Sequence, residues 1–387
     1  MSYIGSKPAD AVLETDDIAD GVVTNPKLST GSQQNFRNII INGDMSIAQR
    51  GTSSSSVTDS GYYTIDRFKW NVSASDTVTL SQSTDVPTGQ GFTNSYKVDV
   101  TTEDSSIGAN EFAHIQHRIE AQNLQYLKYG TSSAETLTLS FWVKSTKTGT
   151  YCIALEKEDN TRYDYVAEYS ISSASTWEKK TITIAPDSNI KAAGGAIDNN
   201  NGEGFNLKFV LATGSSRQGS NETWNTSTPA DGTSNQVNFL DSTSNDFYLT
   251  GVQLEAGTTA SDFEFLPYDV NLTRCYRYYR TIVPLNTDNR GFSPGFYTAN
   301  DNGRFIFPLD NPMRAIPTLD STSGTDYFRI FSAGGSDSIN SFSIMSDNST
   351  NRFIIANNTT EASGIGGQAA YVLSSNNNAY LALEAEL

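Results

Sequence analysis

The sequence predicts an all-β protein made of antiparallel sandwiches. Short runs of alternating apolar residues recur at close intervals, Ser, Thr, Asn and Gly fill the spaces between them, and helical periodicity is nearly absent. Many short strands joined by polar turns are typical of sandwiches of the jelly-roll kind. We therefore expect four parts: an N-terminal extended arm, a large antiparallel jelly-roll sandwich, a short connector helix and a smaller C-terminal β-sandwich.

Residues 1–35 are predicted to form an N-terminal attachment arm. The segment DDIADGVVTNPKLSTG has too few large apolar residues to form a core of its own. Pro8 and Pro26 disfavour a continuous helix, because each removes a backbone donor and pushes the preceding residue towards extended geometry. We expect an extended arm that is docked on another protein or wound with copies of itself.

Residues 36–268 are predicted to form the large jelly roll. In TLTLSFWV, alternation places Leu137, Leu139, Phe141 and Val143 on one face and Trp142 on the other. A Ser-rich loop is expected at Thr52–Ser56. The predicted strands are Asp76–Ser83, Tyr96–Thr102, Glu111–Ile119, Glu135–Ser145, Thr150–Lys157, Glu178–Ile184, Phe205–Ala212 and Asp246–Glu255.

A single helix is predicted over residues 269–280. Leu272, Cys275, Tyr276 and Tyr279 fall at i, i+3, i+4 and i+7, which is the stripe of one helix face. One interpretation is an assembly joint, in which Leu272, Cys275 and Tyr279 form an oligomer interface. The other is that these side chains pack the core of one domain.

Residues 281–387 are predicted to form the C-terminal β-sandwich. Pro308, Pro312 and Pro317 limit ladder hydrogen bonding, which suits an edge or a bulged crossover. The final segment AYLALEAEL predicts a strand that pairs within a sheet.

Composition excludes several classes of function. Lys+Arg 26 against Asp+Glu 43 gives a formal charge of −17, so binding to nucleic acid or to an anionic membrane surface is not expected. No apolar run long enough to insert in a membrane and no secretory signal are seen, so we expect the protein to stay in the cytoplasm where it is made unless lysis or special export releases it. Cys152 and Cys275 lie in different regions and suggest two buried thiols, with neither a disulfide nor a zinc site.

Several passages, in this order, resemble tail-fibre or tail-tip proteins of marine and cyanobacterial podoviruses. They are DDIADGVVTNPKL at 16–28, NIIINGDMSIAQRG at 38–51, TLTLSFWVKS at 136–145, WEKKTITI at 177–184, GVQLEAGTTASDFEFLPY at 251–268, TRCYRYYR at 273–280, PMRAIPT at 312–318 and EAEL at 384–387. The resemblance implies a virion appendage, commonly a homotrimer. Its arm would join other tail or fibre proteins, and its outer domains would meet host cell-surface glycan. The first large domain also resembles carbohydrate-binding jelly rolls.

Sugar binding uses aromatic faces together with polar groups that fix hydroxyls. Trp142 and Trp177 are expected to pack, whereas Trp224, in the polar segment GSNETWNTSTPADG, is a candidate glycan-binding tip. From the likeness to jelly-roll modules, Asp44 and Asp246 are candidate ligands of a structural calcium ion. No other cofactor is expected. His114 and His117 are not expected to form a metal pair, because an i, i+3 pair on a strand faces opposite sides.

No serine has the glycine pattern of a nucleophile elbow, and carboxylates for glycoside cleavage cannot be paired from sequence. We therefore predict no catalytic residues. The resemblance implies a structural, glycan-adsorbing protein of a phage tail fibre. The alternatives are a tailspike-like polysaccharide depolymerase and a purely structural tail or collar adaptor.

Overall fold

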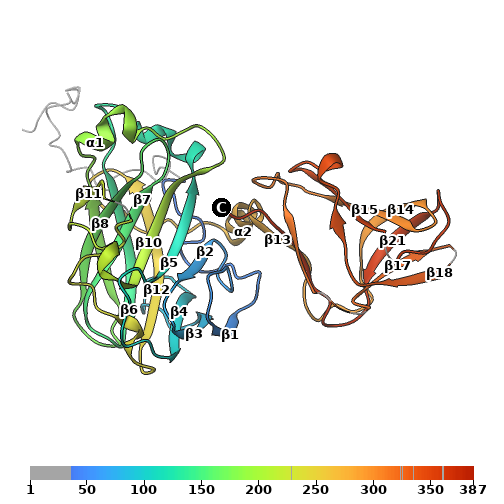
Figure 1. The fold of residues 1–387 in the computed structure, drawn as a ribbon, viewed down its shortest axis with the longest axis horizontal. Helices are drawn as coiled ribbons and strands as arrows, with labels where there is room; N and C mark the ends of the chain where they lie inside the picture. The colour runs from blue at the N-terminus through green and yellow to red at the C-terminus, as the bar shows by residue number, and fades with distance from the viewer. Residues whose placement is uncertain (1–35, 228, 323, 325, 334, 360) are drawn as a thin grey trace, which may run out of the picture. The chain divides into compact units, whose positions relative to one another are not determined.

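The structure is a computed structural model that describes residues 36–387 except 228, 323, 325, 334 and 360 (Figure 1). The features described below lie in the compact unit Asn38–Leu387. The predicted arm, residues 1–35, lies outside the described residues. In the part of the chain that is described, no helix combines the length and the apolar character needed to cross a membrane.

The first sandwich is an antiparallel jelly roll of two six-stranded sheets, as predicted (Figure 1). The chain alternates between the sheets, which separates neighbours in sequence and brings distant strands together. Sheet A has the order β1 (Ser53–Val57), β3 (Thr77–Ser83), β4 (Ser95–Thr102), β12 (Asp246–Ala256), β6 (Leu137–Ser145) and β9 (Glu178–Ile184). Sheet B has the order β11 (Thr223–Asn225), β8 (Tyr163–Ile171), β7 (Gly149–Lys157), β10 (Glu203–Thr213), β5 (Phe112–Glu120) and β2 (Phe68–Val72).

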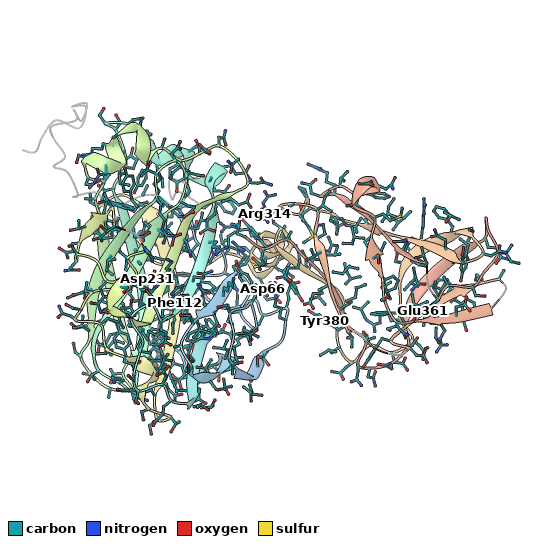
Figure 2. The ribbon with its side chains drawn as sticks, viewed as in Figure 1. Asp66, Phe112, Asp231, Arg314, Glu361 and Tyr380 are labelled. Carbon is teal, nitrogen blue, oxygen red and sulfur yellow. The ribbon has the colours of Figure 1, made fainter. Side chains whose placement is uncertain are left out.

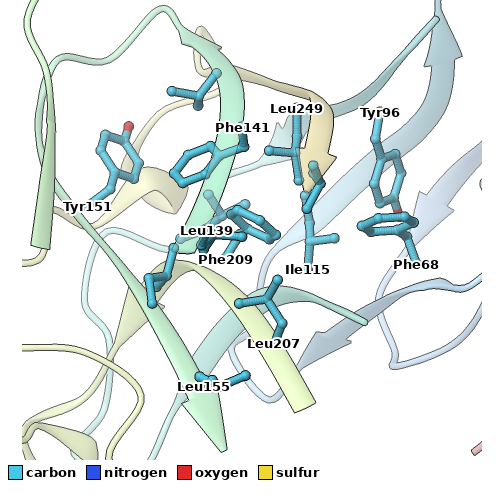
Figure 3. Packing of buried hydrophobic residues seen from close by; sticks show 14 of the residues in the cluster. Phe68, Tyr96, Ile115, Leu139, Phe141, Tyr151, Leu155, Leu207, Phe209 and Leu249 are labelled. Carbon is cyan, nitrogen blue, oxygen red and sulfur yellow. The ribbon is translucent and has the colours of Figure 1, made fainter. Parts of the chain in front are cut away.

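The core lies between the inner faces of these sheets. Leu139 and Phe141 of β6 pack with Leu207 and Phe209 of β10, and the rings of Phe141 and Phe209 meet edge to face with centroids 5.0 Å apart (Figure 3). Burying each such side chain contributes about 1.5–3 kcal/mol. The predicted alternation is confirmed, because Leu137, Leu139, Phe141 and Val143 are fully buried while Trp142, on the opposite face, is only partly buried.

Two elements of the first sandwich differ from prediction. The Ser-rich segment expected as a loop is strand β1, which pairs with β3 at the edge of sheet A. Strand β8, YDYVAEYSI, was not predicted, because Asp164 and Glu168 interrupt its apolar residues. These acidic residues face away from the core, where Asp164 pairs with Arg162 and Glu168 accepts hydrogen bonds from Thr233 and Asn235.

The predicted helix is present but ends earlier than expected. Helix α2 spans Tyr268–Tyr276, and strand β13 (Tyr279–Val283) follows almost at once. The extension to residue 280 was wrong, because Tyr279 pairs with Glu384 in a sheet. A helical pattern in sequence did not reveal this competing strand partner about 100 residues away.

The C-terminal unit has its own apolar core and two antiparallel sheets. The three-stranded sheet has the order β13, β22 (Leu381–Glu384) and β16 (Thr318–Ser321). The seven-stranded sheet has the order β18 (Gly335–Ile339), β17 (Phe328–Ser332), β21 (Ala369–Ser374), β14 (Gly291–Ala299), β15 (Asn302–Pro308), β20 (Phe353–Asn358) and β19 (Ser343–Ile344). The predicted terminal strand is confirmed as β22, which is central in its sheet.

Strand β15 corrects the expectation of an edge strand. It lies between β14 and β20 in the seven-stranded sheet. The sheet tolerates Pro308 because this residue is the last of the strand, while Pro312 and Pro317 lie outside strands.

Candidate functional site

A polar cleft lies on the outer face of sheet B, and we call it the sheet B cleft. Its volume is about 220 Å³. The lining comes from strands β2, β5, β7 and β10 and from two flanking loops: Asn71, His114, Gln116, Arg118, Glu156, Arg162, Asn206, Lys208, Arg217 and Pro229. Figure 2 labels Phe112 and Asp231, which contact these lining residues.

Strand alternation places these polar side chains on one face. In β5, Ala113, Ile115 and Ile119 belong to the core, so His114, Gln116 and Arg118 point outward. The ladder sets Lys208 of β10 opposite Gln116, and Asn206 opposite both Arg118 and Glu156. Residues distant in sequence therefore become neighbours.

The floor of the cleft is a network of neutral side chains. Asn71 Nδ2 donates to Gln116 Oε1 at 3.2 Å and lies 3.0 Å from His114 Nε2, and Asn206 Nδ2 donates to Gln116 Oε1 at 3.4 Å. His114, Gln116 and Asn206 are at most 3% exposed. Among the described residues, His114 Nδ1, Gln116 Nε2 and Asn206 Oδ1 have no hydrogen-bond partner. A buried polar group without a partner is costly, so these three atoms are candidate ligand contacts.

A frame of ion pairs holds one side of the cleft. Lys208 Nζ lies 2.9 Å from Asp231 and also contacts Glu156, while Arg217 lies 2.6 Å from Asp231. Arg162 lies 3.0 Å from Glu156 and 3.2 Å from Asp164. Although burial alone would raise the pKa of Asp231, the charge of Lys208 beside it holds that pKa below its usual value. Asp231 therefore stays ionised, and the frame stays intact at neutral pH.

The carboxylates of the frame all form ion pairs with cationic side chains. Glu156, Asp164 and Asp231 each face lysine or arginine at hydrogen-bond distance. At the rim, Arg118 Nε lies 3.2 Å from Glu203, whose pKa is raised to about 7 by burial. These ion pairs fix the positions of the polar side chains that line the sheet B cleft.

His114 gives the cleft a measurable pH dependence. Burial lowers its pKa from 6.5 to about 3, so between these values the unfolded chain binds more protons than the folded one. The stability that neutral His114 contributes is thus present above pH 6.5 and is lost as pH falls towards 3. We expect the difference in unfolding temperature between wild type and His114→Gln to shrink from pH 7.5 to pH 4.5, as measured by differential scanning calorimetry. A difference that is unchanged over this range would contradict the buried neutral imidazole.

The candidate glycan tip Trp224 is instead a core residue. Its side chain is 3% exposed, and its Nε1 donates to the carbonyl of Ala185 at 3.0 Å. The centroid of its ring lies 5.3 Å from the ring centroid of Tyr165 and 6.2 Å from that of Tyr129. The prediction was wrong because the apolar partners of this polar segment lie about 60 and 95 residues earlier in the chain.

The structure does not bring Asp44 and Asp246 together. Asp44 Oδ1 accepts hydrogen bonds from Ser46 and Asn271, whereas Asp246 pairs with Lys97 at 2.9 Å. Gly43 bonds to Val252, six residues beyond Asp246 on β12, which separates the two carboxylates by roughly 20 Å. One calcium ion, with ligands at about 2.3–2.6 Å, cannot use both. Within the described residues no group of three or more His, Cys, Asp and Glu is placed to hold a metal ion.

The three residues predicted at an oligomer interface are used within the chain. Cys275 is fully buried, and with partly buried Leu272 it packs against Ile41, Ile47 and Tyr278. Tyr279 is also fully buried, and its hydroxyl donates to Asp320 at 2.6 Å. Cys275 and Tyr279 therefore pack within the chain, as the second interpretation predicts, whereas the oligomer interface stays a prediction. Cys152 and Cys275 are both buried free thiols, as predicted.

His114 is not among the residues that the sequence predicts to bind a glycan. His114 and His117 do face opposite sides, since His117 contacts the ring of Phe68 and the backbone of Ile41. The missed signal is polar residues at alternate positions of two strands, in AHIQHR of β5 and in FNLKF of β10. Strands whose apolar residues already fill a core present such residues on their outer face.

No protein-family model matches the chain, and no curated protein matches its sequence. Several solved structures match the chain in fold. The enzymatically active domain of tailspike protein 4 of bacteriophage CBA120 matches at 12% identity with a TM-score of 0.29, over 57% of this chain and 22% of that one. A putative sugar-binding protein from Bacteroides thetaiotaomicron matches at 11% identity with a TM-score of 0.31, over 57% of this chain and 100% of that one. A family 11 carbohydrate-binding module from Clostridium thermocellum, in complex with a mixed-linked tetrasaccharide, matches at 11% identity with a TM-score of 0.26, over 54% of this chain and 99% of that one.

Proposed function

We propose that the sheet B cleft binds a saccharide and that the chain is an adsorption protein of a phage tail appendage. The observation that carries the proposal is the floor of the cleft. There Gln116 Nε2 and Asn206 Oδ1, a donor and an acceptor, are buried without a partner among the described residues. A sugar hydroxyl both donates and accepts, so adjacent hydroxyls of one ring match such a pair.

Charge favours a neutral, hydroxyl-rich ligand over an anionic one. Three of the four cations that line the cleft pair with a carboxylate at 3.0 Å or less: Arg162 with Glu156, and Lys208 and Arg217 with Asp231. The fourth, Arg118, lies beside Glu203, whose pKa of about 7 leaves it partly ionised at neutral pH. An anion would have to displace these carboxylates from their cations. The guanidinium groups of Arg118 and Arg162 remain partly exposed and can still donate to hydroxyls at the rim.

The virion role rests on the resemblance to tail-fibre proteins. In such an appendage, residues 1–35 attach the chain to a tail or fibre protein, and the chain assembles as a homotrimer. Single saccharide contacts are weak, and three linked copies raise the apparent affinity without any new contact. No catalytic step is part of this proposal.

A glycan array probed with the full-length protein tests the binding function. Leucine keeps the approximate size of glutamine and asparagine but cannot form hydrogen bonds. We therefore expect Gln116→Leu and Asn206→Leu each to weaken binding to the recognised glycans by roughly 5- to 150-fold, since leaving a ligand hydroxyl unpaired costs about 1–3 kcal/mol. The matched control is Gln122→Leu, because Gln122 is exposed and lies beyond the end of β5.

Two results would contradict the proposal. One is that wild type binds no glycan on arrays that include microbial polysaccharides. The other is that wild type binds while both cleft variants, shown by circular dichroism to be folded, bind equally well. Release of reducing ends from a bound polysaccharide by the wild-type protein would instead favour the depolymerase alternative.

A further inference from the structure

A second cavity lies on the outer face of sheet A, and we call it the sheet A pocket. Its volume is about 280 Å³, whereas a water molecule in the liquid takes about 30 Å³. The lining comes from β6, β9 and β12 and from the segments before β4 and after β12. It shares no residue with the sheet B cleft.

One wall of the sheet A pocket is a triad of phenylalanines. The rings of Phe92, Phe263 and Phe265 contact one another pairwise, with centroids 4.9–5.1 Å apart. Phe92 is 8% exposed, but Phe265 is 49% exposed. The triad thus has a buried base and an accessible edge, which is an apolar surface that a ligand can reach.

Trp142 of β6 lines the same pocket and points away from the core. Its strand neighbour is Lys179 of β9, and Ser140 lies two residues earlier on the same face. Lys179 and Gln90 are exposed at the rim. The pocket therefore combines apolar rings with donors and acceptors, which is typical of a small-molecule site and unlike a dry protein-docking face.

Gly251 keeps the space between these walls open. It has a φ of +61° at a point where the pairing of β12 with β6 shifts register. A Cβ at this position would lie 2.6 Å from the Phe92 ring and 3.1 Å from Trp142. Any other residue would therefore fill the junction of the aromatic walls, in addition to straining the backbone.

We infer that the sheet A pocket is a second saccharide site, which takes a pyranose bearing a methyl group, such as an N-acetyl or a 6-deoxy sugar. The apolar face of the ring stacks on Trp142, and the methyl group contacts the phenylalanine triad. Ser140, Gln90 and Lys179 bond the hydroxyls. This site is independent of the sheet B cleft and does not require that the cleft bind sugar.

The sheet A pocket can be tested by ¹⁹F NMR of full-length protein that carries 5-fluorotryptophan. The four tryptophans report on different places, because Trp70 and Trp224 are buried in the core and Trp177 bonds to Asp85 outside the pocket. Trp142→Phe assigns the Trp142 signal. We expect N-acetyl-D-glucosamine or L-fucose to shift the Trp142 signal saturably, with a dissociation constant on the order of 1 mM, while the signals of Trp70 and Trp224 stay in place.

D-glucose for N-acetyl-D-glucosamine and L-galactose for L-fucose have the same ring configuration without the methyl group, and each is expected to cause at most one tenth of the shift at equal concentration. Gln116→Leu should leave the response unchanged, which separates this site from the cleft. Lys179→Met, an exposed change that spares the fold, should weaken the response several-fold. If neither methyl-bearing sugar shifts the Trp142 signal, or if the matched sugars without a methyl group shift it equally, the inference is wrong.

Discussion

Replacing Arg67 with alanine is expected to lower the free energy of unfolding by about 3–5 kcal/mol, because the change breaks a buried ion pair and leaves the Glu386 carboxylate with Arg50 alone, at 3.4 Å. Arg67 is 1% exposed and pairs with Glu386, whose side chain is 5% exposed. The Arg67 guanidinium also donates to the carbonyl of Arg118 at 2.5 Å and lies 3.4 Å from the ring centre of Tyr278. Burial by itself would lower the pKa of Arg67, but the charge of Glu386 raises it above its usual value, so the pair stays ionised.

Urea unfolding followed by circular dichroism measures this effect. The control is Arg290→Ala, since Arg290 is exposed, and we expect a change within about 0.5 kcal/mol. Glu386→Gln should also destabilise the protein, and adding it to Arg67→Ala should cost much less than the sum of the two single changes. A loss below 1 kcal/mol for Arg67→Ala would mean that the C-terminal residues do not hold this arginine in solution.

Replacing Trp224 with alanine is the second change with a large expected effect. Removing a fully packed tryptophan costs about 3–5 kcal/mol, and here the Nε1 bond to Ala185 is lost as well. Thermal unfolding should show the loss. The remaining folded protein should bind the same glycans at 20 °C as the wild type, because Trp224 does not line the sheet B cleft.

The comparison variant is Trp177→Ala, since Trp177 is only partly buried and should cost less when it is replaced. The opposite pattern would restore the sequence-based interpretation of Trp224. In that pattern Trp224→Ala would leave stability nearly unchanged and would abolish glycan binding.

Local alternation was enough to predict the sandwich. In β6 the alternation of Leu139 and Phe141 with polar residues predicts the buried face without any further information, because side chains on a strand have a period of two. The same logic found β22 at the end of the chain. It failed for β8, where acidic residues facing outward broke the apolar run.

What the sequence could not predict depends on contacts between distant segments. Tyr279 has a helical spacing from Leu272 but joins a strand, since β22 pairs with it. The polar sequence around Trp224 predicts an exposed side chain, but in the fold Tyr129 and Tyr165 pack against it. The sheet B cleft needs β2, β5, β7 and β10 in adjacent positions, and this order follows from the topology of the sandwich and not from any motif.

A crystal structure of the full-length protein with the strongest-binding glycan of the array is the most direct test of the sheet B cleft. We predict electron density for a sugar ring in the cleft, with hydroxyls within hydrogen-bond distance of Gln116 Nε2 and Asn206 Oδ1. Density in the sheet A pocket in addition would agree with both sites. An ordered glycan bound elsewhere, with the sheet B cleft free of sugar, would contradict the proposed function.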